Sequence, residues 1–367
     1  MSKSPRLVCE DVLTQRLLGI PDSATTTTTT YTTVTVVPTE TGSTTTTWGS
    51  WDPSSSSSTT SWSSWTSGAS ASFYTSTTSA VVWSTPSAVP SGGSGKAAIA
   101  PAGSLWALTY SPYTASGGCK DAGSITTDIT AIKALGFTTV RIYSTDCSGL
   151  ENVGTAARSV GLKLILGVFI ESSGISGAQP QVSEIVAWGQ WDLVEMIIVG
   201  NEALYNNYLS VSDLAGFISS SKWAFSNAGY TGPVTTTEPL SSWIQEGSSL
   251  CSSIDVVAAN IHAFFNAQTA ASQAGAFIQS ELVILDGICP GKSTYVVESG
   301  WPHAGQPNGA AIPGPSEQAT ALASIQSTCG SQVVFFTYED DLWKAPGAFD
   351  VEQSWGCADV FQNGTAW

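Results

Sequence analysis

The chain has 367 residues, only 11% of them charged, and its 28 acidic and 12 basic side chains give a formal net charge of −16. Nucleic acids and anionic lipid surfaces are bound through clusters of basic residues, so this composition argues against nucleic acid and lipid partners. The 14 tryptophans instead suit a neutral ligand that stacks on aromatic rings, and sugars have this property.

Residues 1–23 form an N-terminal segment of uncertain role. They carry Glu10, Asp11 and Arg16 where the apolar centre of a secretory signal peptide would lie. Either the true start is lost or mis-assigned, or export uses another route, and we favour a wrong start because of the segment that follows.

Residues 24–103 are dominated by Thr, Ser, Gly and Pro, as in the stretch SSSSSTTSWSSWTSGAS. Such a tract has too few aliphatic side chains to offset its conformational entropy, which predicts a disordered arm. Ser/Thr-rich segments with proline are typical of O-glycosylated stalks of exported proteins. We therefore expect residues 24–103 to be a stalk or linker.

The cysteines predict disulfides rather than a metal site. Besides Cys9, the second part of the chain holds six cysteines, which allows up to three disulfides whose pairing the sequence leaves open. No CxxC pair occurs, and His262 and His303 cannot complete a Cys/His zinc set at the usual spacing. We expect no metal and no cofactor, and oxidised cysteines favour a secreted protein.

Residues 104–367 alternate short apolar runs with amphipathic segments. Runs that are apolar almost throughout are typical of parallel strands covered on both faces. Eight such segments in about 265 residues predict a (β/α)8 TIM barrel. A doubly wound sheet is the alternative, but no GxGxxG turn opens a helix here. The expected strands lie in residues 105–113, 137–147, 162–170, 194–202, 232–238, 255–265, 293–301 and 332–340.

Helix signals lie between several of these runs. Isoleucines recur at helical spacing after Lys120, and Gly136 stands where a C-terminal cap belongs. Ser210 and Asp213 have the spacing of a capping box, and Ser316-Glu317 is expected to open a helix that ends near Gly330.

Two of the strands end in a glutamate. VEMIIVGNEALY places Glu202 at the end of the fourth run, and STYVVESGWP places Glu298 at the end of the seventh. In a closed barrel the carboxyl ends of all strands surround one mouth, so we expect the two acids to face each other. A single strand-end glutamate is more often just solvated, but two carboxyl groups ~5–5.5 Å apart cleave glycosidic bonds with retention of configuration.

The motifs NEALY, ESGWP, ANIHAFFN, TTVRIYSTDCSG and EDDLWKAPG together resemble glycoside hydrolase family 17, the β-1,3-glucanase family of plants and fungi. The resemblance runs from about residue 104 to the end and is closest to fungal cell-wall members with a Ser/Thr-rich arm. Some of these are labelled β-glucosidases, and others act as β-1,3-glucanases or glucanosyltransferases. Ala263 and Ser299 replace the proline and threonine that are usual in the family, which puts only loop geometry in doubt.

The resemblance implies a role for each residue at the expected mouth. Glu202 would be the general acid/base and Glu298 the nucleophile. Arg141 would hold Glu298 ionised, although an ordinary ion pair is the simpler interpretation. Asn201 would bind the 2-hydroxyl of the sugar, although an ordinary polar residue at a strand end is the simpler interpretation. His262 would position Glu298 or a sugar hydroxyl, and Trp343 and Lys344 would flank the sugar. Similar candidates that core packing explains nearly as well are Tyr110, Tyr143 and Trp301.

The sequence therefore predicts a secreted, wall-associated, monomeric retaining glycosidase that acts on β-glucan, with β-1,3-linkages favoured. Endo-hydrolysis, release of terminal glucose and glucanosyl transfer remain open, because all three share a covalent intermediate. The second class is a non-catalytic glucan-binding wall protein, which the presence of both glutamates argues against. No apolar run reaches the roughly 20 residues of a membrane-spanning helix, and Asn363-Gly364-Thr365 is a weak N-glycosylation signal.

Overall fold

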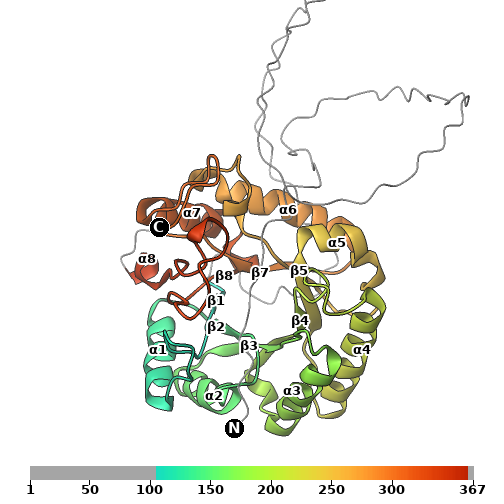
Figure 1. The fold of residues 1–367 in the computed structure, drawn as a ribbon. Coiled ribbons are helices and arrows are strands. Elements are labelled where there is room, and N and C mark those ends of the chain that lie inside the picture. Colours follow the sequence, from blue (N-terminus) through green and yellow to red (C-terminus); the bar gives the residue numbers. More distant parts are fainter. Residues whose placement is uncertain (1–104, 363–367) are drawn as a thin grey trace, which may run out of the picture. The chain divides into compact units, whose positions relative to one another are not determined.

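The computed structural model describes residues 105–362, and Figure 1 shows them as a ring of strands inside a ring of helices. The expected segments 1–23 and 24–103, Cys9 and the Asn363–Thr365 signal lie outside the described residues. None of the helices in the described part is long and apolar enough to cross a membrane.

The strands form a closed parallel barrel, because β1 pairs with both β2 and β8. Each strand falls within one residue of a predicted run, which confirms the (β/α)8 fold. The strands are β1 Ala107–Thr109, β2 Thr139–Ile142, β3 Lys163–Val168, β4 Val194–Asn201, β5 Val234–Pro239, β6 Val257–Asn260, β7 Thr294–Ser299 and β8 Val333–Phe335.

The helices cover the outside of this barrel, one after each strand (Figure 1). Short 3-10 turns interrupt several of the loops, among them Ala263–Phe265 after β6. The helices are α1 Ala122–Ala134, α2 Gly149–Val160, α3 Ile175–Trp188, α4 Val211–Asn227, α5 Leu240–Glu246, α6 Ala274–Ile288, α7 Pro315–Cys329 and α8 Ala358–Gln362.

The structure confirms two of the predicted helix signals, the glycine after α1 and the capping serine before α4. Gly136 follows α1 with a φ of +97°, a left-handed conformation that glycine adopts at low cost. The Ser210 hydroxyl caps α4 by accepting a hydrogen bond from the Asp213 backbone N–H at 3.2 Å. The same hydroxyl donates to the Asp213 carboxylate, so the two side chains close the first turn of the helix.

The core has two layers, as expected for strands that are covered on both faces. A large layer joins the strands to the helices, and a second cluster fills the barrel interior with side chains such as Trp106, Met196 and Tyr295. The barrel is therefore a packed support, and reactive groups of this fold lie at the mouth formed by the carboxyl ends of its strands.

Two disulfides form among the six cysteines of the described part, where the sequence allowed three. Cys119 pairs with Cys147, and Cys251 pairs with Cys289. Cys329 and Cys357 stay reduced and buried, and their sulfurs contact the carbonyl oxygens of Ile325 and Thr337 instead. A buried thiol behaves as a small apolar side chain, so these two act as packing residues.

We expect the disulfide between Cys119 and Cys147 to stabilise the fold measurably, because it closes a loop of 28 residues between the segments after β1 and β2. Replacing both cysteines with serine should lower the free energy of unfolding by about 2–4 kcal/mol. Urea unfolding followed by circular dichroism measures this, with Cys329→Ala as the control that removes a thiol but no bridge. A loss below about 0.5 kcal/mol would contradict the prediction.

Candidate active site

Polar side chains gather at the carboxyl ends of the barrel strands. Arg141 lies on β2, Asn201 ends β4, Asn260 ends β6 and Glu298 lies at the end of β7, while Glu202 directly follows β4. The first four are buried, and Glu202 is half-buried. Because all strands of a parallel barrel end on the same side, these residues share one mouth.

A chain of hydrogen bonds joins the two glutamates. The Arg141 guanidinium donates from Nη1 to Glu298 Oε1 at 3.0 Å and from Nη2 to Asn201 Oδ1 at 2.8 Å. Asn260 Nδ2 donates to Asn201 Oδ1 at 3.2 Å and to Glu202 Oε1 at 2.9 Å. The Thr237 hydroxyl donates to Asn260 Oδ1 at 2.9 Å, which fixes the orientation of that amide. The structure thus brings both predicted acids into one network.

The backbone turns sharply at the end of β4 to present Glu202. Gly200 has a φ of +91°, and Glu202 has a φ of +55°, which is unusual for a residue with a side chain. The Glu202 N–H bonds to the Thr237 carbonyl oxygen at 2.8 Å, where the pairing of β4 with β5 shifts register. Neighbouring side chains of a regular strand point to opposite faces of the sheet. This irregular strand end instead directs both Asn201 and Glu202 into the same network.

The surroundings separate the acidities of the two glutamates. Burial alone would raise the pKa of Glu298, but the Arg141 guanidinium, the His262 ring and Lys344 together hold this pKa below its ordinary value. Burial and the negative charge of Glu298 raise the pKa of Glu202 to about 7, against the opposing effect of the Asn260 hydrogen bond. Near pH 5 one group is therefore ionised and its neighbour protonated.

His262 lies beside Glu298, as predicted. Its Nε2 is 3.5 Å from Glu298 Oε2, and its ring packs edge-on against Phe336 and Trp355 with centroid distances of 5.4 and 4.9 Å. These aromatic neighbours hold the imidazole against the carboxylate.

Three further candidates lie near these acids. The Tyr143 ring stacks on the Arg141 guanidinium at 4.5 Å, and burial and the charge of Glu298 raise the pKa of Tyr143 well above its usual value. Lys344 Nζ pairs with Asp341 at 2.9 Å and lies 4.8 Å from the centroid of the Phe336 ring. Trp343 donates from Nε1 to the same aspartate at 3.0 Å. These contacts fix the loop after β8, and the charge of its Lys344 lowers the pKa of Glu298.

Tyr110 and Trp301 lie in the core instead. Both are fully buried. The Tyr110 hydroxyl donates to Asp128 on α1 at 2.8 Å, and the Trp301 indole donates to the Ile312 carbonyl oxygen at 2.9 Å. The packing interpretation of these two aromatics agrees with this placement.

The structure adds three polar residues that the sequence prediction did not select. Asn260 ends β6 as Asn201 ends β4, so the shared strand-end amide was a usable signal. Glu238 lies near the end of β5 and is fully buried, and the predicted run 232–238 already ended at this residue. Glu352 is buried close to Lys344 and Glu298, and its pKa is raised chiefly by burial. The sequence prediction missed Glu352 because this residue is far from any strand end.

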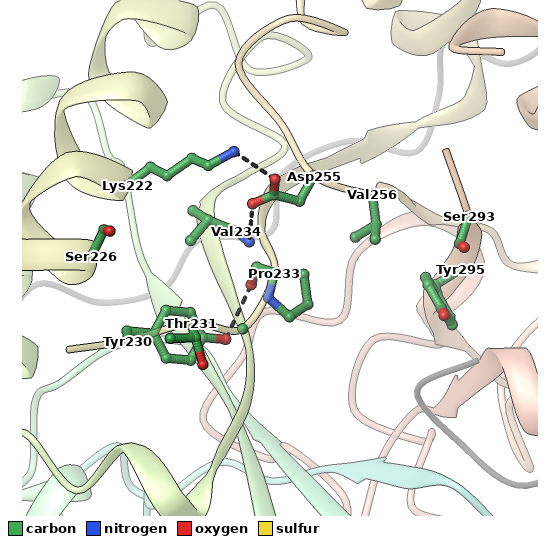
Figure 2. Close-up of a pocket in the computed structure, with 11 residues that line it drawn as sticks. Lys222, Ser226, Tyr230, Thr231, Pro233, Val234, Asp255, Val256, Ser293 and Tyr295 are labelled. Carbon is green, nitrogen blue, oxygen red and sulfur yellow. Dashed lines mark hydrogen bonds and ion pairs between the residues drawn. The ribbon is translucent and has the colours of Figure 1, made fainter. Parts of the chain in front are cut away.

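A separate cavity of about 450 Å³ lies at the other end of the barrel (Figure 2). Its wall includes residues at the amino ends of β5 to β7, with the Lys222–Asp255 ion pair at 2.5 Å and the Tyr230 hydroxyl bonded to the Pro233 carbonyl oxygen. Since reactive groups of such barrels lie at the carboxyl ends, this cavity is remote from the two glutamates. Within residues 105–362, no group of three or more His, Cys, Asp or Glu side chains is placed to hold a metal ion.

Comparison with known sequences gives one family over most of the described part. A model of the BtgE/BtgC glycoside hydrolase domain matches residues 107–356. A probable beta-glucosidase btgE of Neosartorya fischeri is 57% identical over 259 residues, which are 71% of this chain and 47% of the relative. The protein of the same name from Aspergillus terreus is 57% identical over 254 residues, 69% of this chain and 46% of the relative. The chain thus spans about half the length of these relatives.

Solved structures with the same barrel include two enzymes with named activities. A glycoside hydrolase family 17 β-1,3-glucanosyltransferase from Rhizomucor miehei has a TM-score of 0.62 at 19% identity, over 70% of this chain and 94% of that chain. An endo-laminarinase from Formosa Hel1_33_131 has a TM-score of 0.61 at 14% identity, over 73% of this chain and 89% of that one. At these identities the likeness establishes the fold.

Proposed function

This chain belongs to the BtgE/BtgC glycoside hydrolase family, and from that premise we propose that it cleaves β-glucosidic bonds of cell-wall β-glucan by a retaining mechanism. The observation that carries the proposal is the pairing of Glu202 and Glu298 in one network with pKa values shifted in opposite directions. Two carboxyl groups in one mouth, one protonated and one ionised, are what this reaction requires. The relatives named probable beta-glucosidase support the substrate class.

In the first step Glu298 attacks the anomeric carbon of the bound sugar. The bond from that carbon to the glycosidic oxygen breaks, and Glu202 gives its proton to this oxygen, so the leaving chain departs as a neutral alcohol. In the second step the ionised Glu202 takes a proton from water, and the water oxygen displaces Glu298 from the anomeric carbon. The free acid on Glu202 is restored, and the configuration is retained.

The supporting residues act on these two acids or on the sugar. Arg141 and His262 keep Glu298 ionised between turnovers. Because Asn201 Oδ1 already accepts from Arg141 and Asn260, its Nδ2 is the atom left to donate to the 2-hydroxyl of the sugar, an interaction that strengthens in the transition state. Tyr143, Trp343 and Lys344 flank the sugar in this proposal.

We propose hydrolysis as the main outcome, and the choice between endo-cleavage, exo-cleavage and glucanosyl transfer rests on which acceptor reaches the intermediate. Chromatography of the products from laminari-oligosaccharides separates these reactions. Mixed shorter oligomers indicate endo-cleavage, glucose alone indicates exo-action, and products longer than the substrate indicate transfer. Binding of β-glucan with no cleavage of any β-glucan tested would instead favour a non-catalytic wall protein.

The proposal predicts a bell-shaped dependence of kcat/KM on pH. Glu202 must be protonated, so the rate falls as the pH rises through about 7. Glu298 must be ionised, so the rate falls as the pH drops through a pKa that lies below the ordinary value of 4.5. Initial rates on laminari-oligosaccharides from pH 3 to 9 measure both limbs.

The variant Asn260→Ala tests whether Glu202 sets the alkaline limb of this pH profile. The Asn260 amide donates to Glu202 and favours the ionised form, so its removal should move that limb to higher pH while the acid limb stays in place. A limb that moves to lower pH would show that Glu202 does not set it.

We also propose an extracellular location at the wall. Disulfides such as Cys119–Cys147 and Cys251–Cys289 persist in oxidising compartments. Fractionation with an antibody against the barrel tests this, because protein found only in the cytosol would contradict it.

A further inference from the structure

Glu238 is a buried acid that the proposed reaction does not use. It lies near the carboxyl end of β5 with no exposed surface, and no ion pair involves it in the part of the chain that the structure describes. Burial of a carboxyl group without a cation is costly unless hydrogen bonds compensate it. Such a group therefore requires an explanation.

Both carboxyl oxygens of Glu238 accept hydrogen bonds from the backbone that follows Glu202. Oε1 accepts the Leu204 N–H at 2.9 Å, and Oε2 accepts the Tyr205 N–H at 3.1 Å. These amides lie just beyond the end of β4, where the strand ladder no longer supplies acceptors. The carboxyl group of β5 thus takes the place of the missing strand partner.

The segment it holds is conformationally unusual. Glu202 has the left-handed φ of +55°, a conformation that a side chain disfavours and that persists only where the surroundings enforce it. On its other side, the Glu202 carbonyl oxygen accepts the Asn206 backbone N–H and the Asn206 side-chain amide, each at 3.0 Å. The Glu202 N–H bonds to Thr237, the residue before Glu238. Two consecutive residues of β5 therefore hold this turn. Thr237 accepts the Glu202 N–H, and Glu238 accepts the N–H groups of Leu204 and Tyr205.

We propose that Glu238 is a positioning residue, which fixes the turn of residues 202–205 so that the Glu202 carboxyl group meets Asn260 and the leaving oxygen of the substrate. The assignment rests on the proposed function, because it concerns the aim of the general acid. It makes β5 a functional strand, because its Thr237 and Glu238 hold the turn that carries the general acid.

The charge state of Glu238 fits this purpose. Burial and, to a lesser extent, the charge of Glu202 raise the pKa of Glu238 to about 8, against the opposing effect of the backbone hydrogen bonds. At the pH where Glu202 is protonated, Glu238 is therefore a neutral acceptor and adds no negative charge next to the acid. Glutamine, which is neutral and of similar shape, retains one carbonyl acceptor for the two amides and is the conservative replacement.

The test exploits the fact that a good leaving group needs no proton. We would measure kcat/KM, which reports the first bond cleavage, on a laminari-oligosaccharide and on a 2,4-dinitrophenyl glycoside of the same sugar. Glu238→Ala should lower kcat/KM on the oligosaccharide by about 100-fold and on the dinitrophenyl glycoside by less than threefold. Glu238→Gln should lie between Glu238→Ala and the wild type on the oligosaccharide and should match the wild type on the dinitrophenyl glycoside.

Glu195 provides the matched control. It lies near the amino end of β4 and accepts hydrogen bonds from Trp106 and Thr139 at 3.2 and 2.5 Å, far from the mouth. Glu195→Gln should leave the ratio of the two kcat/KM values unchanged, even where it lowers the melting temperature.

Equal losses on both substrates in Glu238→Gln, or no loss on either, would overturn the positioning role. Glu238→Gln decides the question even where Glu238→Ala fails to fold. A wild-type protein that cleaves neither substrate would instead refute the proposed function, and the assignment of Glu238 with it.

Discussion

Replacing Glu298 with glutamine is expected to abolish turnover on every β-glucan that the wild type cleaves. The amide cannot attack the anomeric carbon, and loss of a covalent nucleophile lowers kcat by at least about 10⁴-fold. The fold should survive, because the amide oxygen still accepts from Arg141, which also donates to Asn201 and to the Val297 carbonyl oxygen at 2.6 Å. Residual activity within tenfold of the wild type would refute the nucleophile assignment.

The loss must be separated from misfolding, since the substitution leaves the buried Arg141 charge without its carboxylate. Removing one partner of a buried ion pair costs about 3–5 kcal/mol, so a lower melting temperature is expected alongside intact circular dichroism. Glu246→Gln makes the same chemical change on an exposed glutamate of α5 and should keep full activity.

A covalent label tests the role of Glu298 independently. A 2-deoxy-2-fluoroglucosyl fluoride forms the glycosyl-enzyme quickly and releases it slowly, so mass spectrometry should find the sugar on the peptide that contains Glu298. Label on a peptide with Glu202 instead would exchange the two roles.

Much of the fold was readable from the sequence because a parallel barrel imposes a local pattern. Strands buried on both faces become continuous apolar runs, and each observed strand lies within one residue of such a run. Since reactive groups of this fold sit at strand ends, the same pattern places Glu202 and Glu298 in one mouth, whereas Arg141 and Asn201 were selected through the family resemblance. These residues needed no knowledge of the tertiary contacts.

The contacts between strands were not readable, because they depend on lateral register. The β4–β5 pairing shifts between Ile198 and Asn201, and this irregularity places the Leu204 and Tyr205 amides opposite Glu238. Register also decides which way a strand-end aromatic faces. Tyr110 turns toward α1, whereas Tyr143 stacks on Arg141 inside the site. A change of one residue in register would exchange such positions.

Replacing Glu202 with alanine should affect the two chemical steps differently, and this difference identifies the acid/base. On an oligosaccharide, kcat/KM should fall by about 10²–10⁴-fold, because the leaving oxygen is no longer protonated. On a dinitrophenyl glycoside, kcat/KM should stay within about threefold of the wild type, since the first step needs no proton. The second step should be slow on both substrates, because no base activates water.

Azide should restore that second step in Glu202→Ala, because it is a nucleophile that requires no deprotonation and fits the space left by the carboxyl group. The product should be the β-glycosyl azide, formed from the adduct on Glu298 with overall retention. In Glu298→Ala the vacated space lies on the opposite face of the sugar, so azide should yield the α-glycosyl azide. Nuclear magnetic resonance of the anomeric proton distinguishes the two products. A β-azide from Glu298→Ala, or none from Glu202→Ala at any concentration, would show that the carboxyl groups do not have the assigned roles on the two faces of the sugar.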